Sequence, residues 1–349
     1  MVRSGKFFAA VLATVVAFIV PGLQAQTKTT SNTKIGFSLA SYSERWQTDL
    51  DSFQKRAKAL GADVVSDFSG GDDDKQFEQA KKMIDSGIQV LVLIPGTVSK
   101  GIRIVEAAKA KHVKVVCYDS MVRDSDVDLY VGFDAHAIGR AQAQFLVDRA
   151  PKGNYVTVSG DPGDKFNNAE FVYEGQMEIL KPYIDRGDIK LVADTWSKDW
   201  SRSEAYVHMV EAIEKAHGDI TAVVASTDGL ADGSIQALQE NKLAGKVLVT
   251  GQDADLGGVI RILDGTQTMT IYKPLSSAAG LAAEAAVKLA KNEPLATKGA
   301  LDNGKKKVPA ILLPLVIVTK DNVSQTVIKD GFQSLDAIKQ ALPKEKWPK

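Results

Sequence analysis

The sequence contains a single cysteine and no excess of charge of either sign. Cys117 alone cannot form a disulfide within the chain. Lysine and arginine together number 43, as do aspartate and glutamate, so the formal net charge is zero and the isoelectric point is near 6.9. Without a broad basic field, the chain is unsuited to nucleic acid as its main partner. Its 28 glycines and 11 prolines in 349 residues are too few for a low-complexity or collagen-like chain.

Several signatures of catalysis and cofactor binding are also missing. The four histidines show neither an HExxH motif nor a zinc-binding spacing. No GxSxG motif marks a nucleophilic serine. Residues 299–305 match GxxxxGK, but Lys306 stands where a phosphate-binding loop needs serine or threonine, and no strand is predicted before it. Paired carboxylates are still compatible with glycoside hydrolysis, so an exported carbohydrate-active enzyme is kept as an alternative.

The first 25 residues have the pattern of a secretory signal peptide. Arg3 and Lys6 precede an apolar stretch from Phe7 to Val20, and Ala25 follows at a plausible cleavage site. A membrane anchor is the alternative, but spanning takes about 20 apolar residues and no second stretch follows. We therefore expect residues 1–25 to be removed on export. An exported chain without disulfides fits a bacterial periplasm.

From residue 34 onward, short strands are predicted to alternate with helices. Continuous apolar runs such as Val90 to Ile94 are typical of parallel strands covered on both faces. The predicted strands span 34–39, 64–68, 90–94, 113–118, 129–133, 154–159, 190–195, 222–226, 247–251, 268–272 and 311–318. The predicted helices span 44–60, 75–86, 175–183, 203–216, 233–240, 256–263 and 276–291.

These strands are too many for one small sheet without strain, and no glycine- and serine-rich linker separates two halves. The predicted fold class is therefore α/β, with two doubly wound parallel-sheet lobes joined by strands that cross between them. Such a joint leaves a cleft with a hinge around it.

Sheets of this class bind ligands outside the carboxyl ends of their strands. Three predicted strands end in VVCYD, VVASTD and VTGQD, which places Asp119, Asp228 and Asp253 at such ends. These aspartates suit a neutral polyol, whose hydroxyl groups both donate and accept, and indole rings suit its C–H faces. We therefore predict a sugar ligand. Other strand ends bring further polar and aromatic candidates: Arg45, Trp46, Asn168, Trp200 and Lys273.

Several of these residues also have a plainer interpretation. The three strand-end aspartates are favoured residues for capping the helices that follow. Trp46 lies at a predicted helix start, where tryptophan is more often part of the core. Lys273, before Pro274, would be an ordinary solvated loop residue. The acidic run at residues 72–74 is interpreted as a helix start favoured by the helix dipole.

Seven stretches of the chain carry a more specific signal, among them IGFSLASYSERWQTD, NNAEFVYEGQMEILKPYID, VVASTDGLADGSIQAL and GTQTMTIYKP. On these motifs the sequence resembles the D-xylose-binding proteins of ABC sugar importers, within the type I periplasmic sugar-binding family, over residues 34–332. The resemblance implies a binding protein without catalytic activity or cofactor. It would capture a monosaccharide, D-xylose, and deliver it to a membrane permease. A chemoreceptor is a further partner known for related proteins.

The resemblance also implies a division of the chain and a set of ligand residues. The N-terminal lobe would comprise residues 34–137 and 275–312, and the C-terminal lobe residues 138–274 and 313–340, with crossings near residues 137, 274 and 313. Trp46 and Trp200 match the aromatic pair that encloses the sugar ring. The residues that match ligands of the sugar hydroxyls are Arg45, Asp119, Asn168, Asp253 and Lys273.

Two positions depart from the family pattern. Ser120 stands where xylose binders have arginine, and Thr227 stands where they have asparagine. The loop before Asn168 is two residues longer, which places Lys165 and Phe166 where a ligand carboxylate is expected. Either Lys165 supplies a replacement charge, or Ser120 leaves room for a larger sugar. Another pentose, a hexose or a small polar ligand therefore stays an alternative. A sugar-sensing repressor would need a DNA-binding module where the signal peptide is predicted.

Overall fold

The computed structural model describes residue 1 and residues 33–42, 44–163, 168–297 and 299–348, without the side chains of residues 44, 45, 98, 275 and 276. The predicted signal peptide, Lys165 and Phe166 lie outside these residues. Within the described residues, thirteen strands form three sheets of seven, four and two strands. No helix of the described chain is long and apolar enough to cross a membrane.

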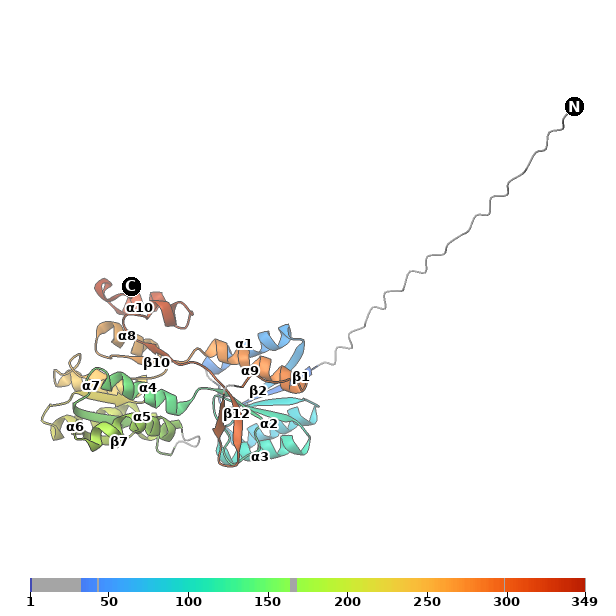
Figure 1. Ribbon diagram of the computed structural model, residues 1–349, viewed down its shortest axis with the longest axis horizontal. Coiled ribbons are helices and arrows are strands. Elements are labelled where there is room, and N and C mark those ends of the chain that lie inside the picture. The colour runs from blue at the N-terminus through green and yellow to red at the C-terminus, as the bar shows by residue number, and fades with distance from the viewer. Residues whose placement is uncertain (2–32, 43, 164–167, 298, 349) are drawn as a thin grey trace. The chain divides into compact units, whose positions relative to one another are not determined.

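The seven-stranded sheet has the order β11-β12-β5-β4-β3-β1-β2. All neighbouring strands pair in parallel except β11 with β12, which together form an antiparallel hairpin. Helices α1 and α9 cover one face of this sheet, and α2 and α3 cover the other (Figure 1). The strands are β1 (Thr33–Leu39), β2 (Ala62–Phe68), β3 (Val90–Ile94), β4 (Lys114–Tyr118), β5 (Leu129–Gly132), β11 (Gly299–Asp302) and β12 (Lys307–Leu312). The helices are α1 (Glu44–Ala59), α2 (Asp73–Asp85), α3 (Val98–Ala110) and α9 (Leu275–Ala290).

Strand β3 shows why this sheet needs helices on both faces. All five of its residues are buried. Val90 and Val92 belong to the core cluster that includes α1 and α9, whereas Leu91 and Leu93 belong to the cluster that includes α2 and α3. Because alternate side chains point to opposite faces, an unbroken apolar strand can be buried only between two layers. The prediction made from the apolar run is confirmed.

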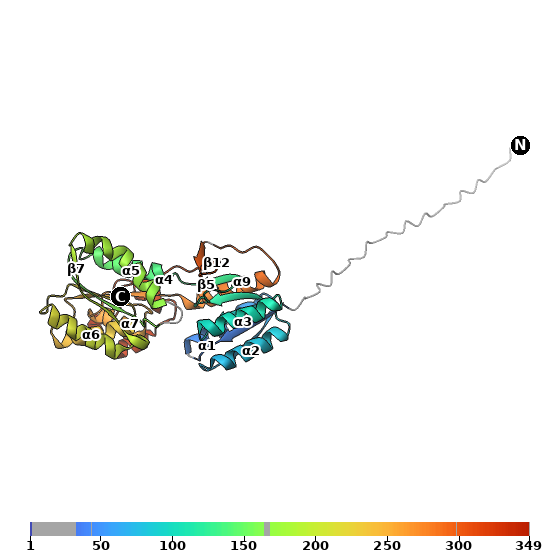
Figure 2. The same cartoon turned by 90° about the horizontal axis from the view of Figure 1, so that it is seen from below.

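The four-stranded sheet has the order β7-β6-β8-β9, and all of its strands are parallel. Helices α4 and α5 lie on one side of it and α6 and α7 on the other (Figure 2). The strands are β6 (Gly153–Ser159), β7 (Ile189–Trp196), β8 (Ala222–Ala225) and β9 (Leu248–Val249). The helices are α4 (Ala135–Val147), α5 (Asn168–Asp185), α6 (Arg202–Lys215) and α7 (Asp228–Glu240).

A small antiparallel pair extends this second sheet. Strand β10 (Thr270–Tyr272) pairs with β13 (Val316–Val318), and a parallel bridge joins Ile271 to Gln252, just beyond β9. Helices α8 (Leu256–Asp264) and α10 (Leu335–Ala341) pack with this pair in one apolar cluster. The chain thus returns to the second sheet after completing the first.

Several predicted elements differ from the structure. Residues 311–318 were expected to form one strand, but they are divided between β12 and β13, which belong to different sheets. Pro314 lies between them, and proline cannot donate a ladder hydrogen bond. The GxxxxGK match at residues 299–305 forms β11 and the hairpin turn, with no helix following. The α-helices and strands without a sequence prediction are α3, α4, α10 and β11.

Helices α4 and α5 approach each other through two glycines. A Cβ atom at Gly139 would lie 1.9 Å from the carbonyl oxygen of Val172, and one at Gly175 would lie 2.1 Å from that of His136. Neither position has room for any side chain, so the two backbones are in direct contact. This contact holds residues 172–176 of α5, which follow Asn168 by one to two turns, against residues 136–139 near the start of α4.

The Gly175→Ala substitution should therefore lower the free energy of unfolding by about 1–3 kcal/mol, because the added methyl group forces α4 and α5 apart. Gly280→Ala in α9 is the matched control, since a Cβ there meets nothing within 4 Å. Alanine should stabilise that helix by roughly 0.5–1 kcal/mol. Urea unfolding followed by circular dichroism measures both changes. Equal effects of the two substitutions would contradict the close packing.

Candidate functional site

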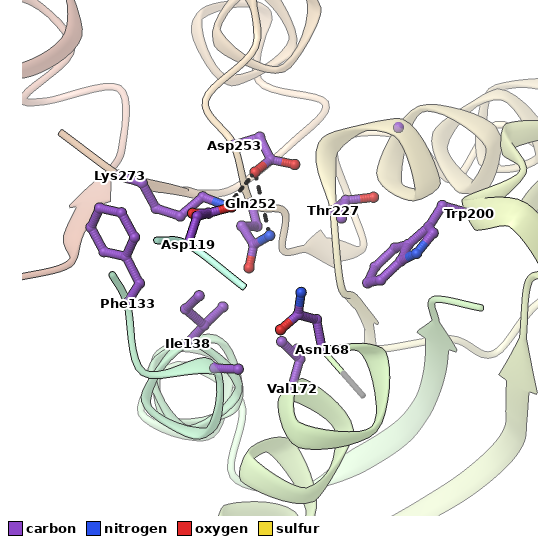
Figure 3. A pocket seen from close by; sticks show the side chains of 12 residues that line it. Asp119, Phe133, Ile138, Asn168, Val172, Trp200, Thr227, Gln252, Asp253 and Lys273 are labelled. Atoms are coloured by element: carbon purple, nitrogen blue, oxygen red, sulfur yellow. Dashed lines mark hydrogen bonds and ion pairs between the residues drawn. The ribbon is translucent and has the colours of Figure 1, made fainter. Parts of the chain in front are cut away.

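A cavity of about 440 Å³ opens at the carboxyl ends of strands from both large sheets (Figure 3). Asp119 follows β4 and Phe133 follows β5 in the first sheet, while Thr227 follows β8 in the second. Carboxyl ends of parallel strands are where doubly wound sheets bind ligands. The remaining lining residues are Ala135, Ile138, Asn168, Val172, Trp200, Gly229, Gln252, Asp253 and Lys273.

This cavity brings together six of the nine residues predicted from the sequence: Asp119, Asn168, Trp200, Thr227, Asp253 and Lys273. Gln252 also lines it but was not predicted as a site residue. It directly precedes Asp253 in the VTGQD motif, so the motif itself was the available signal.

Two further predicted residues line a different cavity. Trp46 and Ser120 face a space of about 280 Å³ at the carboxyl ends of strands in the seven-stranded sheet. The neighbouring residues Asp119 and Ser120 thus line separate cavities. Arg45 lies in the first turn of α1, next to Trp46, and its side chain is outside the described part. The other residues that line this second cavity are Ala40, Ser41, Gly71, Asp73, Ile94, Pro95 and Gly96.

Asp73 is a candidate that the sequence analysis missed. Asp72 caps α2 by accepting a hydrogen bond from the Lys75 amide at 2.9 Å, so the prediction of an acidic helix start is confirmed. Asp73 has a second property, because it lines the cavity together with Trp46. Its carboxylate lies over Gly96, where a Cβ would be only 2.1 Å from Oδ1. Its position at the start of α2, in the connection that follows β2, could have identified it as a site residue.

Three residues that line the first cavity have a left-handed backbone although none is glycine. The φ angles are 62° at Asp119, 56° at Trp200 and 95° at Asp253. Such a conformation is uncommon for residues with a side chain and costs on the order of 1–3 kcal/mol each. It persists only where surrounding contacts hold it. Each of the three turns therefore needs specific partners.

Asp119 is held by its own backbone hydrogen bonds. Its amide donates to the carbonyl oxygen of Val131 at 3.0 Å. The buried Tyr130 hydroxyl lies 3.0 Å from the carbonyl oxygen of Asp119 and 3.1 Å from that of Phe133. Burial raises the pKa of Tyr130 above its usual range, so this hydroxyl remains protonated and able to donate.

Trp200 depends on a glycine at the end of β6. A Cβ atom at Gly160 would lie 2.4 Å from the indole ring, so the ring rests directly on the backbone there. The Trp200 amide donates to the carbonyl oxygen of Ser197 at 3.1 Å, and the Asp199 amide donates to Oδ2 of Asp161 at 2.9 Å. The indole is thereby fixed at the cavity wall (Figure 3).

Asp253 forms an ion pair within the cavity. Lys273 Nζ lies 2.8 Å from Asp253 Oδ1, and Gln252 Nε2 donates to the same oxygen at 3.3 Å (Figure 3). The lysine side chain is 12% exposed and the aspartate side chain 45%. The pair therefore offers an acceptor and a donor side by side at the cavity surface. Such an arrangement can bind a hydroxyl group, which both donates and accepts.

Asp228, the third strand-end aspartate, lies in the core and does not line the cavity. Its carboxyl accepts hydrogen bonds from Gln267 Nε2 at 2.7 Å and from the Asp255 amide at 3.0 Å. Burial, with a further contribution from Asp255, raises the pKa of Asp228 to about 8. The prediction that it shares a surface site with Asp119 and Asp253 is therefore wrong.

The capping alternative is wrong as well, because none of the three aspartates is a helix cap. Thr227 caps α7, where its hydroxyl accepts from the Leu230 amide at 3.3 Å. Asp255 caps α8 through the Gly258 amide. No helix follows Asp119 before β5. Thr227 thus both begins a helix and lines the cavity.

Comparison with known proteins shows which class of protein has this fold and site. The model of the periplasmic binding protein domain family matches residues 35–294, and the chain belongs to this family of solute-binding proteins, which are not enzymes. The chain is 46% identical over 289 residues to the D-xylose-binding periplasmic protein of Escherichia coli strain K12, covering 83% of this chain and 87% of the relative. It is 42% identical over 334 residues to the D-xylose-binding periplasmic protein of Haemophilus influenzae, covering 95% and 99%.

Solved structures lead to the same class. A carbohydrate transporter solute-binding protein from Chloroflexus aurantiacus, in complex with D-glucose, aligns with a TM-score of 0.75 at 32% identity and covers 87% of this chain and 97% of its own. A solute-binding protein from Clostridium phytofermentans with bound β-D-glucose aligns with a TM-score of 0.74 at 29% identity, covering 88% and 100%. The predicted resemblance and the type I periplasmic binding protein fold are confirmed.

The buried carboxyl of Asp228 predicts a pH dependence of stability. In the unfolded chain it ionises near a pKa of about 3.9, whereas in the folded protein its pKa is about 8. Between these values the unfolded chain loses the proton and the folded protein keeps it, so this group lowers the stability as pH rises from about 4 to about 8. Asn at this position does not titrate.

The free energy of unfolding of the wild type minus that of Asp228→Asn should therefore fall between pH 5 and pH 8, by at most about 1.4 kcal/mol per pH unit. Urea unfolding at several pH values in this range measures the difference. A difference that stays constant, or grows with pH, would contradict a protonated Asp228.

Proposed function

We propose that this chain is the binding component of an ABC sugar importer, which captures D-xylose and delivers it to a membrane permease. The cavity at the strand ends carries the proposal, because it places two carboxylates, an ammonium group, two amides and an indole around one space. The two curated relatives named above, both xylose-binding, support this sugar as the ligand.

The chemistry of these side chains fits a neutral sugar. Asp119 and Asp253 would accept hydrogen bonds from hydroxyl groups, and Lys273 would donate to a sugar oxygen. Asn168 has both a donor and an acceptor. Trp200 would pack its flat face on the C–H groups of the ring. The Asp253 carboxylate is already balanced by Lys273, so it requires no positive charge on the ligand.

Trp46, Ser120 and Arg45 would complete the same site from the seven-stranded sheet, together with Thr227 from the second. We propose that residues 34–137 and 275–312 form one lobe and residues 138–274 and 313–340 the other. A sugar that contacts both lobes would favour their closed arrangement, because a ligand shifts an equilibrium only through contacts that one state lacks. The closed face would then dock on the permease.

The location follows from the same proposal. Residues 1–25 would direct export as a cleaved signal peptide, and the mature chain would act in the periplasm. The family of periplasmic binding proteins supports this location. A chemoreceptor is a further proposed partner for the sugar-bound form.

D-Glucose is a second candidate ligand, favoured by the space at Ser120. This small side chain lines the second cavity where xylose binders carry arginine. A further cavity of about 430 Å³ adjoins the first through Phe133, Ala135 and Asn168. The solved relatives that hold glucose show that the family accommodates a hexose.

Titration calorimetry of the exported protein, freed of endogenous sugar by unfolding and refolding, distinguishes these ligands. The panel comprises D-xylose, D-glucose, D-galactose, D-ribose, L-arabinose and D-allose. We expect 1:1 binding of D-xylose. Binding of glucose alone would retain the transport role and make Ser120 and Thr227 the determinants of specificity. No binding of any sugar would contradict the proposal.

The Gly160→Ala substitution should weaken sugar binding, because its methyl group displaces the Trp200 indole. Stacking of an aromatic ring contributes about 0.5–1.5 kcal/mol, so the dissociation constant should rise roughly twofold to twelvefold. Calorimetry measures the change, and Gly280→Ala serves as the control that leaves affinity unaltered. Unaltered affinity in Gly160→Ala would show that the indole does not contact the sugar.

A further inference from the structure

The turn that carries Asp253 contains two successive left-handed residues. Asp253 has a φ of 95° and Ala254 a φ of 51°, and neither is glycine. The Asp253 side chain projects from this turn to the ion pair with Lys273. If the turn relaxed to ordinary backbone angles, the carboxylate would leave that position.

Three successive amides of the turn donate to three different buried acceptors. The Asp253 amide donates to the carbonyl oxygen of Ile271 at 2.9 Å. The Ala254 amide donates to the Thr270 hydroxyl at 3.2 Å, and the Asp255 amide donates to the Asp228 carboxyl at 3.0 Å. Two of the three acceptors are therefore side chains, which a substitution can remove.

Asp228 and Thr270 form one buried unit behind the turn. Both are fully buried, and neither lines the cavity. The Thr270 hydroxyl bonds to the Asp228 carboxyl as well as to the turn. Gln267 Nε2 donates to the same carboxyl at 2.7 Å. These hydrogen bonds fix the positions of the two side-chain acceptors that the turn amides use.

Two glycines enclose the Asp228 carboxyl so that it cannot swing away. A Cβ atom at Gly251 would lie 2.0 Å from Oδ1, and one at Gly258 would lie 2.3 Å from Oδ2. The glycine of the VTGQD motif therefore gives the carboxyl the space in which it reaches the turn. The position of the acceptor is set by backbone contacts on both sides.

We infer that Thr270 and Asp228 are positioning residues for sugar binding, which hold the left-handed turn and thereby keep the Asp253 carboxylate beside Lys273. This inference rests on the proposed sugar-binding function. Neither residue would touch the sugar, because both are fully buried and neither lines the cavity. A residue that serves stability alone would lower the unfolding free energy without changing the affinity of the folded protein.

Thr270→Val tests the inference, with Thr250→Val as the matched control. Thr250 is also fully buried and its hydroxyl also makes a hydrogen bond, to the carbonyl oxygen of Ala225 at 3.1 Å, away from the turn. Thr270→Val should raise the dissociation constant for D-xylose about tenfold, the upper range for one lost hydrogen bond. Thr250→Val, and Thr270→Ser with its retained hydroxyl, should stay within about twofold of the wild type. Equal affinity losses in the two valine variants, or none in Thr270→Val, would overturn the inference.

Amide hydrogen exchange followed by NMR tests the turn without a ligand. In the sugar-free wild type, the amides of Ala254 and Asp255 should exchange slowly although neither lies inside a helix or strand. Fast exchange there would overturn the inference even if no variant folds. If no sugar binds the wild type but these amides are protected, the proposed function is wrong. The role of Thr270 and Asp228 in holding the turn is then still supported.

Discussion

The site depends on contacts beneath the cavity that hold left-handed backbone after the ends of parallel strands. Asp119, Trp200 and Asp253 each reach the cavity from a conformation that a residue with a side chain seldom adopts. The contacts that hold these turns come from Tyr130, from the glycine at the end of β6, and from the unit of Asp228 and Thr270. Because these contacts lie below the cavity surface, they hold the groups that line the cavity without needing a ligand.

Much of this arrangement follows from the sequence through simple rules. Apolar runs and helical spacing predicted most strands and helices, and the rule that ligands bind at strand ends predicted Asp119, Trp200 and Asp253 at one cavity. The same rule failed for Asp228 because it does not say which way a residue faces after its strand ends. That direction is set by contacts with residues far along the chain, such as Gln267. Pro314 was the available signal that residues 311–318 are not one strand.

Thr227 and Ser120 differ from the residues expected in xylose binders, and each of them lines one of the two cavities. Thr227 begins α7 through its hydroxyl, which asparagine can also do, and so this exchange preserves the local fold. Ser120 is different, because the resemblance to xylose binders predicts arginine at this position, and the cavity that Ser120 lines also contains Asp73 and Trp46. The Asp73 carboxylate can accept a hydrogen bond, but it cannot replace the positive charge of an arginine. Selectivity among sugars is therefore expected to depend mainly on this second cavity.

We propose that the two cavities described above are parts of one sugar site. A crystal structure of the xylose-saturated protein tests it most directly. The account predicts one sugar ring in contact with both Trp46 and Trp200, with its hydroxyl groups within hydrogen-bond distance of Asp119 and of the Asp253–Lys273 pair. A sugar bound at only one of the two cavities, or at neither, would contradict the account.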